Sequence, residues 1–176
     1  MKNNNKIFLG EFIASCFLVM VIVGSGIMAE NLTNDNAVRL LANTIATGAG
    51  LFVLITSFAN ISGAHLNPFV SLSMYLTKKI KGKELLTYVP AQIVGCLLGV
   101  MLANVFFEYS IIELSTKNRD GFHIFLSEIV ATFGLIFIIF ATLKDRKNTV
   151  DACVATYISA GYWFTSSTSF ANPAVA

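Results

Sequence analysis

Two Asn-Pro pairs carry the residue types and spacing that most clearly indicate a function. Asn67-Pro68 and Asn172-Pro173 each follow an apolar segment and precede what is predicted to be another helix. Asn is a preferred N-cap because its side-chain oxygen accepts from an unpaired backbone N–H, and Pro suits the first helical position because no N–H is needed there. A helix that begins inside a membrane directs its positive dipole end toward the bilayer interior. Two such helices entering from opposite sides would place two amide donors at the centre of a channel.

The chemistry of this arrangement would be hydrogen bonding to a passing molecule, without proton transfer or a covalent step. The alternative is that both asparagines only cap helices in a packed bundle. An enzyme is disfavoured, because isolated carboxylates and two separated histidines, His65 and His123, form no predicted catalytic cluster. For the same reason we expect no metal site and no cofactor.

Composition places these residues in a membrane. The 176 residues are 55% hydrophobic and 12% charged, with a mean hydropathy of +0.70, which is typical of a polytopic α-helical membrane protein and not of a soluble domain or a nucleic-acid-binding protein. The odd count of cysteines and their wide spacing favour small buried hydrophobes over disulfides for Cys16, Cys96 and Cys153. Residues 1–5 are too short and polar for a signal n-region, so we expect the first helix to be retained.

Five segments are long and apolar enough to span a bilayer of about 30 Å. They are Ile7–Met28, Val38–Ile61, Leu85–Phe107, Phe122–Leu143 and Val150–Phe170. Pro68–Leu76 is apolar but only about half the length needed, and lysines follow it directly. We therefore predict that it is a re-entrant half-helix, which enters and leaves the membrane on one side.

The basic residues predict the orientation. With the N-terminus in the cytoplasm, three residues lie outside: Arg39, Lys117 and Arg119. All the other basic residues then lie inside: Lys2, Lys6, Lys78, Lys79, Lys81, Lys83, Lys144, Arg146 and Lys147. This asymmetry is a strong positive-inside signal.

The sequence repeats internally. In residues 1–108, an early acid, Glu11, is followed by a Gly-containing helix and Asn67-Pro68; in residues 122–176, Glu128 is followed by a helix and Asn172-Pro173. An odd number of spans in the first copy would invert the second copy relative to the first, as in transporters with inverted repeats. Residues 1–176 are therefore predicted to be one transmembrane domain with an incomplete second repeat.

Four motifs resemble the major intrinsic protein family of aquaporins and aquaglyceroporins. They are Ile61-Ser62-Gly63-Ala64-His65-Leu66-Asn67-Pro68, Phe170-Ala171-Asn172-Pro173-Ala174-Val175, Gly10-Glu11-Phe12, and Ala91-Gln92 with Gly95. The resemblance implies an all-α, aquaporin-like inverted-repeat helical bundle with two re-entrant half-helix loops. It also implies a passive channel for water and small neutral solutes, a homotetramer, and a location in the bacterial inner (plasma) membrane.

The resemblance also implies roles for individual residues. The pore centre would comprise Asn67, Pro68, Phe69, Asn172, Pro173 and Ala174. Glu11 and Glu128 would support the two loops, and His65 would line the cytoplasmic half of the pore. Phe69 replaces the family's usual alanine, and its ring would either turn outward or narrow the lumen.

By the same resemblance, an outer constriction would comprise Thr47, either Ala160 or Tyr162, Ser169 and Val175. Water-selective members carry an arginine where this chain has Val175, so we expect a wider and less polar constriction. Glycerol-like polyols, urea or neutral metalloid hydroxides then become candidate solutes. Bacterial members linked to arsenic handling have a string similar to residues 165–173.

The chain ends three residues after Pro173. Compared with the family pattern, it is expected to lack the sixth transmembrane helix and most of the second half-helix. The alternative function is therefore that of a truncated non-conducting or interfering membrane subunit. The permeating solute and gating are left open by the sequence.

Overall fold

The computed structural model describes residues 4–113, 119–145 and 149–176. Within these residues the chain forms six α-helices, which are α1 (Asn4–Leu32), α2 (Asn36–Phe58), α3 (Pro68–Leu76), α4 (Gly82–Phe106), α5 (Phe122–Asp145) and α6 (Val150–Phe164). Four of them, α1, α2, α4 and α5, are long and apolar enough to cross a membrane. The first four predicted spans are therefore confirmed, although their ends differ by a few residues.

The predicted fifth span, Val150–Phe170, is wrong in its extent. Helix α6 ends at Phe164, and its 15 residues cover only about 22 Å at 1.5 Å per residue. Ser and Thr residues dominate the following segment, where their side chains compete with helical backbone hydrogen bonds. Residues 165–171 instead run back toward the middle of the molecule, and Thr168, Ser169 and Ala171 have positive φ.

The predicted bounds of the short helix Pro68–Leu76 are confirmed. Helix α3 begins at Pro68 with Asn67 as N-cap and ends at Leu76, so it has nine residues. Local chemistry explains this result: the cap and the proline determine the start of the helix, and the lysines that follow determine the polar end.

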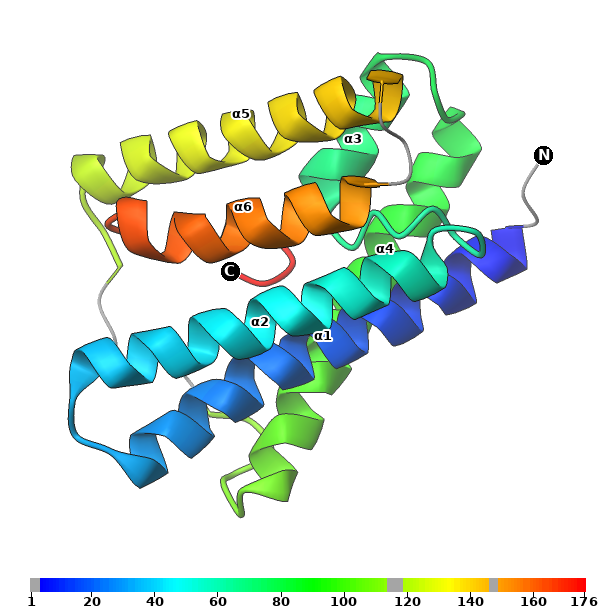
Figure 1. The fold of residues 1–176 in the computed structure, drawn as a ribbon. Coiled ribbons are helices and arrows are strands. Elements are labelled where there is room, and N and C mark those ends of the chain that lie inside the picture. Colours follow the sequence, from blue (N-terminus) through cyan, green and yellow to red (C-terminus); the bar gives the residue numbers. More distant parts are fainter. Residues whose placement is uncertain (1–3, 114–118, 146–148) are drawn as a thin grey trace.

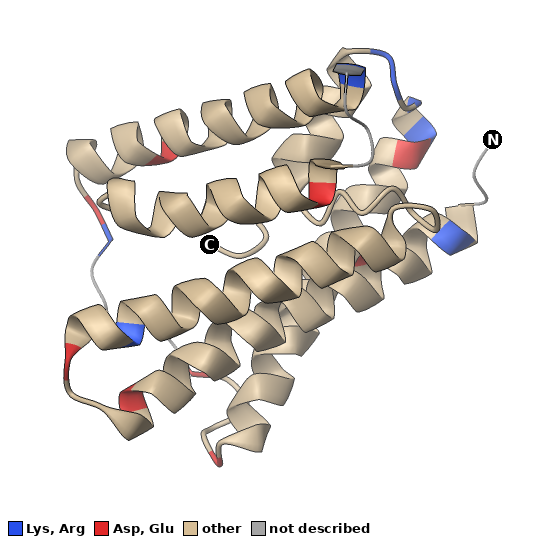
Figure 2. Cartoon of the chain, in the orientation of Figure 1, with Lys and Arg blue, Asp and Glu red and all other residues tan. Residues whose placement is uncertain are grey.

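The helices form two groups. Helices α1 and α2 run antiparallel with α4 crossing α1, while α5 and α6 form a second antiparallel pair, with α6 beside α2 (Figure 1). Helices α1 and α5 run in opposite directions across the molecule (Figure 1). All described Lys residues lie at the end where α1 begins, and the described Arg residues lie at the other end (Figure 2). Lys2, Lys117, Arg146 and Lys147 lie outside the described residues.

Helices α1 and α4 approach closely because α4 presents two glycines to the backbone of α1. A Cβ atom built on Gly95 would lie 2.4 Å from the carbonyl oxygen of Phe12, and one on Gly99 would lie 2.4 Å from that of Cys16. Small residues at this spacing are typical of close helix pairs in membranes. Cys16 and Cys96 are buried, Cys153 is half-buried and all three are free thiols, as the sequence predicts.

Gly99→Ala tests this contact. Because the added methyl group would press on a backbone carbonyl oxygen, α1 and α4 would have to separate, and we predict a loss of about 1–3 kcal/mol of stability. Gly24→Ala is the matched control, since its Cβ would lie 3.5 Å from the nearest atom, in Phe107. Thermal unfolding of both variants in one detergent checks this; equal midpoints would contradict the close contact.

Candidate functional site

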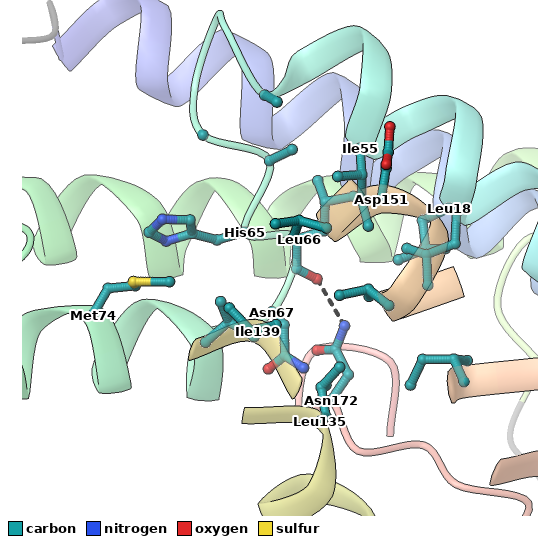
Figure 3. A pocket seen from close by; sticks show the side chains of 18 of the residues that line it. Leu18, Ile55, His65, Leu66, Asn67, Met74, Leu135, Ile139, Asp151 and Asn172 are labelled. Atoms are coloured by element: carbon teal, nitrogen blue, oxygen red, sulfur yellow. Dashed lines mark hydrogen bonds between the residues drawn. The ribbon is translucent and has the colours of Figure 1, made fainter. Parts of the chain in front are cut away.

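A cavity of about 950 Å³ lies between the two helix groups, and every helix contributes to its lining. Its walls are largely aliphatic, with Leu18, Ile55, Leu135 and Ile139 among them (Figure 3). The lining also carries polar side chains, and several of them lie on the two irregular segments that precede the asparagines. A mostly apolar cavity with a few oriented polar groups is the usual form of a small-molecule site.

Each asparagine caps the turn that follows it. The Oδ1 atom of Asn67 accepts from the backbone N–H of Phe69 at 2.8 Å, and that of Asn172 accepts from Ala174 at 3.1 Å. These bonds fix which way each amide faces, because the oxygen is held by the backbone and the nitrogen must point away from it.

The two amides then cross between the halves of the chain. The Nδ2 atom of Asn67 donates to the carbonyl oxygen of Ala171 at 2.6 Å, and that of Asn172 donates to the carbonyl oxygen of Leu66 at 2.7 Å (Figure 3). Each NH₂ group has a second N–H that these bonds do not use. Both asparagines line the cavity, so these donors are available to a molecule inside it.

Glu11 organises the first irregular segment. It is fully buried, and its Oε1 accepts from Ser62 Oγ at 2.6 Å and from the His65 N–H at 3.1 Å. Its Oε2 accepts from the Leu66 N–H at 2.7 Å and from Gln92 Nε2 at 2.8 Å. Four donors compensate for the burial of one carboxylate, so Glu11 is held inside the bundle.

Glu128 makes the equivalent contacts in the second half. Its carboxylate accepts from the N–H groups of Phe170 and Ala171 at 3.0 and 2.7 Å. These two residues stand in the same positions before Asn172 as His65 and Leu66 before Asn67. Leu66 and Ala171 both have positive φ, which costs about 1 kcal/mol or more for a non-glycine residue, and the carboxylates hold them in that conformation.

His65 lines the cavity and is held by two neighbours. Its Nδ1 lies 3.0 Å from Ser71 Oγ, and its ring stacks on Tyr88 with centroids 4.1 Å apart. Tyr88 donates to the carbonyl oxygen of Ser62. The sequence analysis did not identify Ser71 and Tyr88 as site residues. The signal that could have identified them is a polar side chain within an otherwise apolar helix.

The residues expected at the constriction come together with one exception. The Tyr162 hydroxyl donates to Thr47 Oγ1 at 3.1 Å, and both side chains are buried and line the cavity with Ser169 and Val175. Ala160, the alternative to Tyr162, is exposed and is not in the described lining, because residues two apart on a helix point about 200° apart.

Only two of the six residues expected at the centre line the cavity. Phe69 is 45% exposed and points outward, which decides between the two alternatives for its ring. Pro68, Pro173 and Ala174 are also absent from the described lining. These three residues shape the turns, while Asn67 and Asn172 face the cavity. Among the described residues, no group of three or more His, Cys, Asp or Glu side chains could hold a metal ion.

Glu11→Gln tests the role of the carboxylate. The amide replaces one acceptor oxygen with a donor that faces backbone N–H groups, and we predict a destabilisation of about 2–4 kcal/mol. Hydrogen exchange should become faster in residues 62–67 but much less so in residues 168–174, which Glu128 holds. Glu30→Gln, at an exposed position of α1, is the control. Uniform exchange across both segments would contradict a local role.

Comparison with known proteins agrees with this geometry. The aquaglyceroporin AqpS of Rhizobium meliloti (strain 1021) is 47% identical over 168 residues, which are 96% of this chain and 72% of AqpS. Aquaporin TIP1-2 of Musa acuminata is 36% identical over 81% of this chain and 59% of its own length. Aquaporin-4 of Rattus norvegicus is 29% identical over 87% of this chain and 49% of its own length. The chain thus spans less than two thirds of the last two relatives.

The major intrinsic protein family matches residues 1–173. Four membrane-length helices make the chain an integral membrane protein. Because the match runs through both Asn-Pro pairs and covers nearly the whole sequence, the chain belongs to the major intrinsic protein family, whose members are membrane channels and not enzymes.

Proposed function

We propose that the cavity is the pore of a passive channel for water and/or small uncharged solutes such as glycerol-like polyols, urea and neutral metalloid hydroxides. The crossed hydrogen bonds of Asn67 and Asn172 are the observation that carries this proposal. They leave one N–H of each amide to donate to a passing oxygen, while the aliphatic side chains of the lining offer that molecule no hydrogen bond. A solute would therefore be oriented at one point without being bound tightly.

The proposed architecture is an inverted repeat of residues 1–108 and 122–176 with two re-entrant segments. The opposite directions of α1 and α5 (Figure 1) and the equivalent contacts of Glu11 and Glu128 support it. In such a repeat, helix N-termini meet at the centre and make it electropositive. Cations and protons are then disfavoured, while neutral solutes pass.

The outer constriction would select among neutral solutes. Val175 contributes no charge, and the Tyr162–Thr47 hydrogen bond uses one hydroxyl that a water-sized molecule could otherwise contact. One relative in the family is an aquaglyceroporin by name, which supports solutes larger than water. We further propose a homotetramer in a bacterial inner membrane, with the N-terminus in the cytoplasm, on the basis of the family and of the basic residues at one end (Figure 2).

A second candidate is a non-conducting or interfering subunit. It is favoured by α5, which is buried to a much smaller extent than α1. Phe133 and Phe137 are 71% and 64% exposed on this helix. A broad exposed helix face of this kind would suit association with an intact relative.

Stopped-flow light scattering on proteoliposomes separates these candidates. A channel should speed glycerol and water equilibration well above the rate in empty vesicles. The interfering subunit should conduct nothing alone and should reduce flux when it is co-reconstituted with an intact family member. Strict water selectivity would contradict the part of the proposal that includes larger solutes.

Asn67→Asp tests the role of the amide. The substituted carboxylate cannot donate to the Ala171 carbonyl oxygen, and it introduces a negative charge. We therefore predict that glycerol flux falls about tenfold or more, equivalent to about 1.4 kcal/mol. We also predict that cation leak rises. Asn104→Asp is the matched control, because Asn104 is a buried asparagine at the end of α4 that bonds to the Ile111 carbonyl oxygen outside the described cavity lining. If both variants behave alike, the amide has no specific role in conduction.

A further inference from the structure

Arg119 lies in the segment between α4 and α5 and contacts residues 165–171 from the outer side. Its Nη1 atom donates to the carbonyl oxygen of Ser167 at 3.2 Å. Its guanidinium carbon lies 4.3 Å from the centroid of the Phe170 ring, in a cation–π contact,. Two different contacts therefore hold the side chain against the segment that leads down to Asn172.

The Phe170 ring brings this charge close to the cavity. Phe170 lines the cavity, together with Ser169 and Val175, so the guanidinium lies one aromatic ring away from the space where a solute would pass. Partial burial lowers the pKa of Arg119, because it disfavours the charged form. The nearby Glu128 carboxylate and Tyr162 hydroxyl oppose that shift. An arginine in this setting keeps its charge.

No side chain in the described lining supplies a positive charge at this end of the cavity. Lys79 lines the cavity, but it follows α3 at the opposite end of the molecule. The position after the second Asn-Pro segment, where water-selective members of the family carry an arginine, holds Val175.

We propose that Arg119 is a specificity-determining residue, which supplies the fixed positive charge of the outer mouth and disfavours cations there while neutral solutes pass. This inference rests on the proposed channel function. A unit charge within about 10 Å, in surroundings of intermediate dielectric constant, changes the local concentration of a monovalent ion about fivefold. The effect weakens as salt is added.

A structural role for Arg119 makes a different prediction. If it served only to fix residues 165–171, Arg119→Lys would fail because lysine lacks the planar group that stacks on Phe170. If its charge is what matters, Arg119→Lys retains the function, and Arg119→Gln, which can still donate a hydrogen bond, loses it.

Charge-dependent thiol labelling reads this potential directly. Cys16, Cys96 and Cys153 are replaced by Ala, and Val175→Cys is introduced as a reporter in the cavity lining, with Ser166→Cys as a second reporter on the exposed part of the segment. Membrane-impermeant anionic and cationic methanethiosulfonates of similar size are applied to proteoliposomes at low salt. The measured quantity is the ratio of the anionic to the cationic labelling rate.

We expect Arg119→Gln to lower this ratio about 25-fold, because the anionic rate should fall and the cationic rate should rise by about fivefold each. Arg119→Lys should preserve the ratio. Arg39→Gln is the matched control, because Arg39 lies at the same end of the molecule and bonds to the carbonyl oxygens of Thr33 and Glu30. An unchanged ratio in Arg119→Gln at both reporters would overturn the inference, as would an equal loss in Arg119→Lys.

The labelling requires an accessible thiol and not conduction, so it distinguishes the two proposals. Absence of solute flux in the parent chain would contradict the proposed function. The labelling ratio would still test whether Arg119 supplies the positive charge at the outer mouth. With flux present, the ratio of cation leak to glycerol flux should rise in Arg119→Gln and stay unchanged in Arg119→Lys.

Discussion

The crossed hydrogen bonds between Asn67 and Asn172 and the carbonyl oxygens before them connect the two halves of the chain. Each asparagine uses its oxygen to cap its own turn and its nitrogen to bond to the other half. The position of either amide therefore depends on the other segment being in place. The cavity, the conformation of both irregular segments and the direction of the remaining N–H groups all follow from this pairing.

Inside a membrane, the irregular segments that make this pairing need hydrogen-bond partners from the protein, because hydrocarbon holds no water to satisfy their backbone polar groups. The chain meets this constraint with two carboxylates, buried in Glu11 and half-buried in Glu128, rather than with regular secondary structure. Glu11 takes four donors and Glu128 takes two backbone N–H groups. Close packing of α1 on α4, which the glycines of α4 permit, holds Gln92 and Glu11 within hydrogen-bonding distance of each other.

Features with a local cause could be predicted from the sequence. The ends of α3 follow from Asn67, Pro68 and the lysines. Features that depend on tertiary contacts could not be predicted. Choosing Tyr162 over Ala160 required knowledge of where α6 ends. The outward direction of Phe69 depends on the residues around it. The contact of Arg119 with Phe170 joins residues from different segments of the chain.

The most direct test of the account is a measurement of the bond between the halves. Solid-state NMR of the chain in lipid, with ¹⁵N in Asn side chains and ¹³C in Leu carbonyl groups, reports the dipolar coupling between Asn172 Nδ2 and the Leu66 carbonyl. The structure, in which the nitrogen and the carbonyl oxygen lie 2.7 Å apart, predicts a measurable coupling that Asn172→Ala abolishes and Asn104→Ala preserves. A coupling that is absent, or that survives Asn172→Ala, would contradict the account.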